Sequence, residues 1–326
     1  MPAPSDDAPP RGHGVARRAI ERFALIAFGL YHLPLYVNNY PSLGGGGFDD
    51  TGLAASWGRV FTPPGVWVAR HVFGMNGPMP GAYQGDNGDV GEEFGRLLLA
   101  VLLAALAAAI WTIVDRERPR ARWVGAALQL LLRYSIALGL ISYGIAKILP
   151  QQFPPISNAT LERRVGELSP MSLLWTFMQY SRPYAIFGGV MELLAVLLLC
   201  FRRTATLGAL VCLAVMTNVA LLNLAYGVPV KLYALMIVAS SAVLVLYDAP
   251  RLWAVFVRNR AVPSPAPSTL ALHRIPTGAR WGIKVALVGS IVVSSVVAML
   301  PSARRPSPAS SDCRLLRSEF RWISDR

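Results

Sequence analysis

The feature that most constrains the fold is the stretch 130–155, LLLRYSIALGLISYGIAKILPQQFPP, which is apolar and long enough for a helix to cross a bilayer. It nevertheless carries Arg133, Tyr143 and Lys147. At about 3.6 residues per turn, Arg133, Lys147 and Gln151 fall along one side of such a helix, and Tyr143 lies one turn before Lys147. Charge at membrane depth is costly and normally faces a bundle interior or a wet cavity. We therefore expect a polar stripe that the other helices enclose.

Composition places the chain among membrane proteins. Hydrophobic residues make up 54% of its 326 residues and charged residues 15%, against about 25% charged in soluble domains. The apolar residues form blocks close to the ~20 residues that a spanning helix needs. The net charge of +13 comes from basic residues beside those blocks, which is typical of membrane topology and not of nucleic-acid binding. We predict an all-α, polytopic transmembrane helix bundle without a nucleic-acid partner.

Seven segments are expected to span the bilayer, starting from a cytoplasmic N-terminus. A long outer loop, 38–93, follows the first of them and contains a short predicted interfacial helix at 65–74. Residues 169–180 predict a second short helix, which is too short to span. The seven predicted spans are residues 23–37, 94–114, 123–149, 184–201, 206–224, 231–247 and 281–300.

The same pattern divides the chain into six parts. The turn between 206–224 and 231–247 is short, so these two helices are expected to form an antiparallel pair. The six parts are a disordered N-terminus (1–16), two spanning helices with their outer loop (17–122), a four-helix core (123–250), a cytoplasmic linker (251–280), a seventh helix (281–300) and a C-terminal tail (301–326).

Lysine is rare in this chain. Lys147, Lys231 and Lys284 are the only lysines among 31 basic residues. A desolvated ammonium can lose its proton and a guanidinium cannot, so Lys147 is a candidate for chemistry; the alternative is that a lysine simply extends its charge toward the interface more easily. The four histidines and three cysteines show no metal-ligand spacing, so no metal site is expected.

Polar residues of several predicted helices fall at similar depth. A bundle could gather them into one pocket that opens to the outside, with Lys147 and Glu192 as candidate catalytic residues. The alternative is structural: an ion pair between Lys147 and Glu192, with asparagines bonded between helices at about 0.6–2 kcal/mol each. The candidate ligand-binding residues are Tyr143, Gln151, Asn218, Asn223 and Lys231 in the outer half of the bilayer and Arg133 in the inner half.

An ordered series of residues in this core resembles the DoxX-like integral membrane proteins of bacteria. The resemblance implies a four-helix membrane core over 123–250 and a place in the bacterial cytoplasmic membrane. The namesake members are membrane subunits of a thiosulfate–quinone oxidoreductase, and wider relatives include lipid- and vitamin-K-linked membrane enzymes. The residues that carry the resemblance include Arg133-Tyr134, Tyr143-Gly144, Lys147, Gln152-Phe153, Ser169-Pro170-Met171, Trp175-Thr176-Phe177-Met178, Glu192, Met216-Thr217-Asn218 and Val228-Pro229-Val230-Lys231.

Two functions remain as expectations, and the sequence leaves open whether the chain is an enzyme. In the first, the pocket binds a quinone or a lipid headgroup, Lys147 and Lys231 hold or protonate an oxygen, and Glu192 is the proton partner. In the second, the protein is a non-catalytic membrane subunit or chaperone. Its outer loops would then bind a protein partner, with residues 175–180 as the docking surface.

Overall fold

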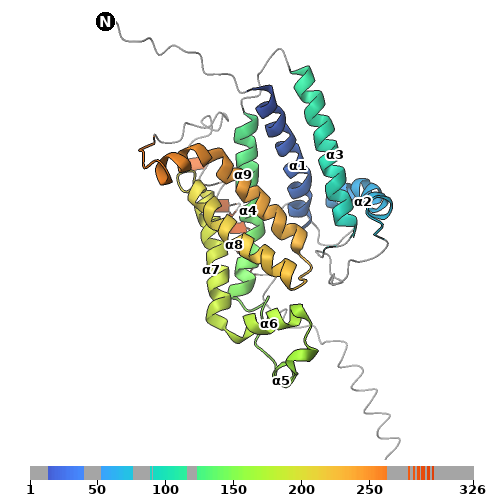
Figure 1. Ribbon diagram of the computed structural model, residues 1–326, viewed down its shortest axis with the longest axis vertical. Coiled ribbons are helices and arrows are strands. Elements are labelled where there is room, and N and C mark those ends of the chain that lie inside the picture. Colours follow the sequence, from blue (N-terminus) through green and yellow to red (C-terminus); the bar gives the residue numbers. More distant parts are fainter. Residues whose placement is uncertain are drawn as a thin grey trace, which may run out of the picture.

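The chain folds into helices throughout the part that the structure describes. The computed structural model describes residues 14–39, 53–75, 89, 91–115, 123–262 and scattered positions between 278 and 296, and these contain no strand. The all-α prediction is confirmed. The helices are α1 (Val15–Asn39), α2 (Leu53–His71), α3 (Gly91–Val114), α4 (Val124–Ile148), α5 (Asn158–Leu161), η2 (Val165–Glu167), α6 (Pro170–Tyr180), α7 (Arg182–Cys200), α8 (Ala205–Ala225) and α9 (Lys231–Phe256) (Figure 1).

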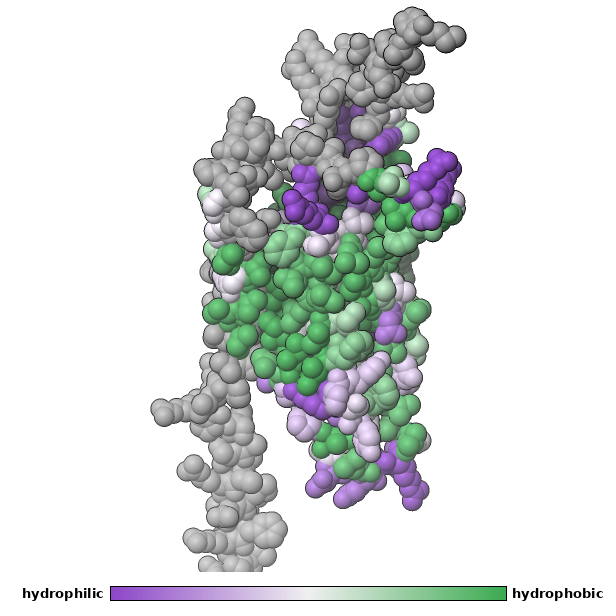
Figure 2. All heavy atoms as spheres, turned by 90° about the vertical axis from the view of Figure 1, so that its left-hand side faces the viewer, coloured by the Kyte–Doolittle hydropathy of each residue, from purple (hydrophilic) through white to green (hydrophobic). Residues whose placement is uncertain are grey.

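Five of the described helices are long and apolar enough to cross a membrane, namely α3, α4, α7, α8 and α9. Figure 2 shows one face of the molecule, where hydrophobic side chains form a broad belt with hydrophilic residues above and below it. A bilayer requires this distribution, because its hydrocarbon layer lies between two polar interfaces. The protein therefore has the surface of a helical membrane protein.

The structure supports five of the seven predicted spans directly. α1 is longer than the predicted 23–37, because Arg17 and Arg22 lie inside it and pair with Glu21 and Asp115. These charges make α1 less apolar than the five spanning candidates. Most of the predicted seventh helix lies outside the described residues, as do residues 1–13 and the tail 301–326. The described positions of 278–296 are helical, and two of them, Val288 and Val296, pack against the core.

Four helices form the central bundle. α4 packs on α7, α7 on α8, α8 on α9, and α9 returns to α4. α1 packs against α4 on another side, followed by α3 and then α2 (Figure 1). α4 is the central helix, since 56% of its apolar window is buried inside the structure against 17% for α3.

α9 extends beyond its predicted end at residue 247. It passes Pro250 and continues to Phe256, so the predicted linker 251–280 begins with helix. Thr206 of α8 donates a hydrogen bond to Asp248, and Arg251 bonds the same carboxylate at 3.1 Å. The Thr206 bond fastens this part of α9 to the start of α8, and the Arg251 bond lies within α9.

The predictions of the two short helices differ in accuracy. α6 begins as predicted, because the Ser169 hydroxyl accepts a hydrogen bond from the backbone N–H of Ser172 at 3.1 Å and Pro170 occupies the first turn. α2 starts well before the predicted residue 65. It packs on α3 at Gly65 and Gly95, where a Cβ on Gly95 would lie 1.9 Å from the Gly65 carbonyl oxygen. Glycines are therefore needed on both sides of this contact.

α4 and α7 also cross closely at two glycines. A Cβ on Gly189 would lie 2.6 Å from the carbonyl oxygen of Gly144, and a Cβ on Gly144 would lie 2.8 Å from Leu193 Cγ. Small residues let helix backbones approach in membrane bundles, where close packing drives association. The crossing brings the Lys147 side chain of α4 against the backbone of α7, since the same Gly189 Cβ would lie 3.0 Å from Lys147 Cβ.

The crossing predicts that Gly189→Ala lowers the unfolding temperature of the detergent-solubilised protein. The added methyl group must push α4 and α7 apart, and overpacking of this kind costs about 1–3 kcal/mol. The matched control is Gly188→Ala, whose Cβ would meet only Lys147 Cδ at 3.8 Å and should leave the unfolding temperature unchanged. Equal unfolding temperatures for the two variants would contradict the close crossing.

Candidate ligand-binding site

A pocket lies in the central bundle between two hydrophobic clusters. The larger cluster, in the long helices of the bundle, contributes Leu140 and Met216. The smaller cluster, around α6, contributes Phe153, Leu174 and Met178. The cavity volume is about 80 Å³, several times the roughly 10–15 Å³ that one buried water needs on this measure. The pocket is open at one side and has room for a small organic group.

The pocket exists because α4 ends before the level at which α7 begins. Lys147, in the last turn of α4, packs against Gly189, which is the seventh residue after Arg182 at the start of α7. α7 therefore extends about 10 Å beyond this contact at ~1.5 Å per residue. α6 and the segment before it cover the space, with the rings of Phe153 and Trp175 edge to face at 5.4 Å between centroids. α6 is the roof of the pocket.

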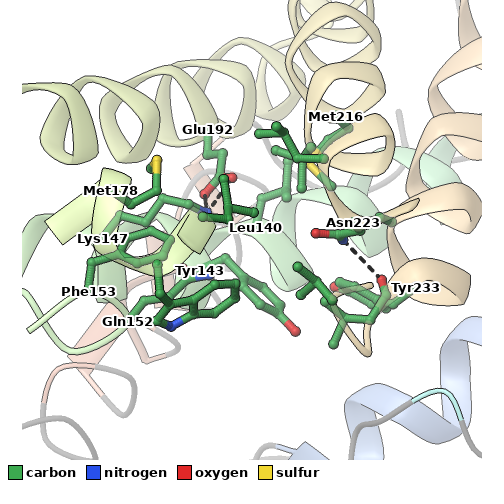
Figure 3. A pocket seen from close by; sticks show the side chains of 17 residues that line it. Leu140, Tyr143, Lys147, Gln152, Phe153, Met178, Glu192, Met216, Asn223 and Tyr233 are labelled. Atoms are coloured by element: carbon green, nitrogen blue, oxygen red, sulfur yellow. Dashed lines mark hydrogen bonds and ion pairs between the residues drawn. The ribbon is translucent and has the colours of Figure 1, made fainter. Parts of the chain in front are cut away.

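A buried ion pair forms one wall. Lys147 Nζ donates hydrogen bonds to Glu192 Oε1 at 2.6 Å and to Oε2 at 2.8 Å (Figure 3). Lys147 is 6% exposed and Glu192 is 2% exposed. The ammonium also lies 5.7 Å from the centre of the Tyr143 ring, within reach of a cation–π contact. Both charges are satisfied, and the oppositely charged partner makes their burial tolerable.

Two tyrosines and an asparagine form a second wall, which Tyr143 joins to the ion pair. The rings of Tyr143 and Tyr233 stack at 5.6 Å with an interplanar angle of 27°. Asn223 Nδ2 donates to the Val230 carbonyl oxygen at 3.4 Å, and Figure 3 shows Asn223 beside Tyr233. Asn223 thus holds the short turn between α8 and α9, whose Val228 and Val230 also line the pocket.

The structure brings together four of the eight candidate residues from the sequence. Lys147, Glu192, Tyr143 and Asn223 all line the pocket. The first two form the ion pair that the sequence analysis proposed as the structural alternative. The ion pair and the pocket therefore occur together, and the pair faces the cavity.

The other four candidates lie elsewhere. Gln151 is exposed, because α4 ends at Ile148 and the helical stripe that would place Gln151 beside Lys147 does not continue. Asn218 is also exposed, because it lies two residues from the buried Met216 and so points about 200° away around α8. Arg133 donates to the Leu199 carbonyl oxygen at 2.9 Å from Nε and 2.6 Å from Nη2, near the other end of α7.

Lys231, the fourth, is held by an aspartate from the segment between α2 and α3. Asp89 Oδ2 accepts hydrogen bonds from the backbone N–H of Lys231 at 2.9 Å and from its Nζ at 3.2 Å. Asp89 Oδ1 accepts from the backbone N–H of Leu232 at 2.9 Å. Asp89 therefore caps the N-terminus of α9 and keeps the Lys231 ammonium outside the pocket lining.

Sequence reasoning assigned no site role to several residues that line the pocket. Gln152 is one of them, and its Oε1 is buried without a hydrogen-bond partner among the described residues. Seven of these residues belong to the series that carries the DoxX-like resemblance, which was the available signal for them. Gln152 and Phe153 follow the end of α4, where helical periodicity no longer predicts which way a side chain points. The seven are Gln152, Phe153, Trp175, Met178, Met216, Val228 and Val230.

Comparison with known proteins gives one similar protein of unassigned role. The chain is 29% identical over 124 residues to the uncharacterized protein YwoB of Bacillus subtilis (strain 168). The aligned stretch covers 38% of this chain and 79% of YwoB. No family model matches the chain. No solved structure matches it.

The ion pair predicts an asymmetric response to substitution. Lys147→Met leaves the buried Glu192 carboxylate without a counter-charge, which typically costs about 3–5 kcal/mol, so the yield of folded protein in detergent should fall sharply. The double variant Lys147→Met with Glu192→Met replaces the pair by apolar side chains and should recover that yield. Size-exclusion profiles of the three proteins measure this, and a single variant as stable as the wild type would contradict the pairing.

The cap predicts that Asp89→Ala loosens the contact between the segment before α3 and the start of α9. Loss of an N-cap costs about 0.5–2 kcal/mol, so the unfolding temperature should drop and limited proteolysis near residue 89 should accelerate. Glu167→Ala is the matched control, because Glu167 is also acidic but exposed, and its hydrogen bonds are made by its backbone atoms. Identical proteolysis of both variants would count against the clamp.

Proposed function

We propose that this chain is an integral membrane protein of the DoxX-like type whose pocket binds a lipid-soluble, oxygen-bearing ligand such as a quinone or a lipid headgroup. One observation carries the proposal. Lys147 Nζ donates to both oxygens of Glu192, and its third N–H has no acceptor in the part of the chain described by the structure. An ammonium has three N–H donors, so one remains for an oxygen of a ligand in the pocket.

The pair also has the chemistry of a proton relay. A ligand oxygen that accepts the third N–H of Lys147 can take a proton from it, while the Glu192 carboxylate at 2.6 and 2.8 Å from Nζ balances the charge. Ionisable residues inside a membrane bundle more often mark such sites than serve as packing. Lys231 has no part in this relay because Asp89 holds its ammonium. The protein would take part in membrane redox or lipid-linked chemistry.

The proposed membrane is the bacterial cytoplasmic membrane, with the N-terminus of the chain in the cytoplasm. Arginines support this orientation, because Arg17, Arg18 and Arg22 precede the apolar part of α1, and Arg202 and Arg203 lie between α7 and α8. The proposed seven spans are the five apolar helices, α1, and the segment around Val288 and Val296, which packs on the core. In this orientation the pocket faces the outer half of the bilayer.

A second candidate function is supported by the outer face of α6. Leu174 and Met178 of this helix line the pocket, whereas Phe177 is 55% exposed and Tyr180 is 79% exposed. Large exposed aromatic side chains are typical of contact surfaces. The alternative is therefore a non-catalytic membrane subunit or chaperone that binds a protein partner through α6 and the outer loops.

The decisive experiment is mass spectrometry of lipids and quinones extracted from the purified full-length protein. The wild type is compared with Lys147→Met/Glu192→Met, and with Asn218→Ala as a control that changes a polar residue outside the pocket. We expect a specific ligand in the wild type and in the control, and at least about ten-fold less in the double variant. The same bulk lipid in all three would contradict the proposal, and a co-purifying polypeptide would then favour the second candidate.

A further inference from the structure

We propose that the ligand of this pocket is a neutral aromatic ring that carries a hydroxyl group, and that Gln152 is the residue that selects the hydroxyl. This rests on the proposed function and narrows its ligand class. Three properties of the pocket carry it: the charge of the lining, the shape of its aromatic walls, and a buried hydrogen-bonding atom that has no partner.

The charge of the lining favours a neutral ligand. Among the described residues that line the pocket, Lys147 and Glu192 are the only charged side chains, and they neutralise each other at 2.6 and 2.8 Å. A phosphate headgroup would bring a negative charge into an apolar site without a free cation, and an unpaired buried charge is very unfavourable. The described lining therefore disfavours a phospholipid headgroup.

The walls favour a flat ring. Tyr143 and Tyr233 stack on each other at one side, and Phe153 meets Trp175 edge to face at 5.4 Å and 66° at the other. Aromatic rings present flat apolar faces that pack best against other rings, in offset-stacked or edge-to-face geometry. Met178 and Met216 also line the pocket, and thioethers adapt to the edges of aromatic rings.

Gln152 supplies the selectivity. Its backbone N–H bonds the Ala146 carbonyl oxygen at 3.0 Å, which ties it to the end of α4 beside Lys147. Gln152 lines the pocket. Its side-chain Oε1 is buried and has no hydrogen-bond partner among the described residues. Buried acceptors are normally hydrogen-bonded, because leaving one unpaired is costly. The atom requires a ligand that donates.

Because Gln152 lies beside Lys147 at the end of α4, one hydroxyl group can satisfy both polar groups at once. It accepts a hydrogen bond from the third N–H of Lys147 and donates one to Gln152 Oε1. A quinone carbonyl or an ether oxygen can accept from Lys147 but cannot donate to Gln152. The pocket therefore favours the reduced, phenolic form of a ring over its carbonyl or alkylated form.

The test uses two probes with the same tail, a para-alkylphenol and its methyl ether, titrated onto the full-length protein in lipid nanodiscs. The wild type should bind the phenol about ten-fold more tightly, because the ether leaves Gln152 Oε1 unpaired. Gln152→Leu should reduce this preference to about two-fold or less. Gln151→Leu is the matched control, because its side chain is exposed and outside the pocket lining, and it should keep the full preference.

The outcomes separate this inference from the proposed function. Equal binding of the two probes by the wild type overturns the selection of a hydroxyl, and if Lys147→Met/Glu192→Met abolishes that binding the pocket itself still stands. A preference that persists in Gln152→Leu reflects the bulk of the methyl group and overturns the role of Gln152. Failure of the wild type to bind either probe overturns the inference, whereas the proposed function is overturned only when the extraction experiment finds the same bulk lipid in the wild type, the double variant and the control.

Discussion

The structure depends on keeping two opposite charges together inside an apolar bundle. Neither Lys147 nor Glu192 could remain buried alone, because an uncompensated charge in this environment costs several kcal/mol. Holding the Nζ within 2.8 Å of both carboxylate oxygens requires α4 and α7 to lie unusually close. Gly144 and Gly189 make this possible, since neither has room for a Cβ. The glycines determine the distance between the helices, and the ion pair determines their register.

The arginines of this chain solve a different problem from its buried lysine. Arg22, Arg133 and Arg182 donate to the carbonyl oxygens of Trp111, Leu199 and Ile148, which belong to the last turns of α3, α7 and α4. A helix end leaves several of its last carbonyls without an intrahelical partner, and the planar guanidinium is well suited to acceptors in this last turn. Arginine is thus used here as a cap for helix ends. Lys147 caps no helix end; it bonds a carboxylate across two helices and faces a cavity.

Sequence reasoning was accurate where one physical constraint decides the structure. Apolar blocks of bilayer length gave the five spanning candidates within a few residues, apart from the longer end of α9, and the opposite charges of Lys147 and Glu192 predicted their pairing. It failed where helices end, as shown by Gln151 and Gln152, whose places depend on α4 stopping at Ile148. It also missed the bond between Lys231 and Asp89, because no local pattern links residues that lie 142 positions apart. The DoxX-like resemblance remains a prediction.

Seven of the 17 residues that line the pocket come from segments outside the five spanning candidates. α6 provides its roof, and the turn that carries Val228 and Val230 provides another wall, fastened by Asp89 from the segment between α2 and α3. α6 presents Met178 to the pocket and Phe177 to the outside, so one short helix serves both surfaces. A partner that moved α6 would change the affinity of the pocket, and by thermodynamic linkage a ligand in the pocket would change the affinity for the partner by the same factor. Ligand binding in the pocket and partner binding on the outer face of α6, if both occur as proposed, would therefore be coupled through this one helix.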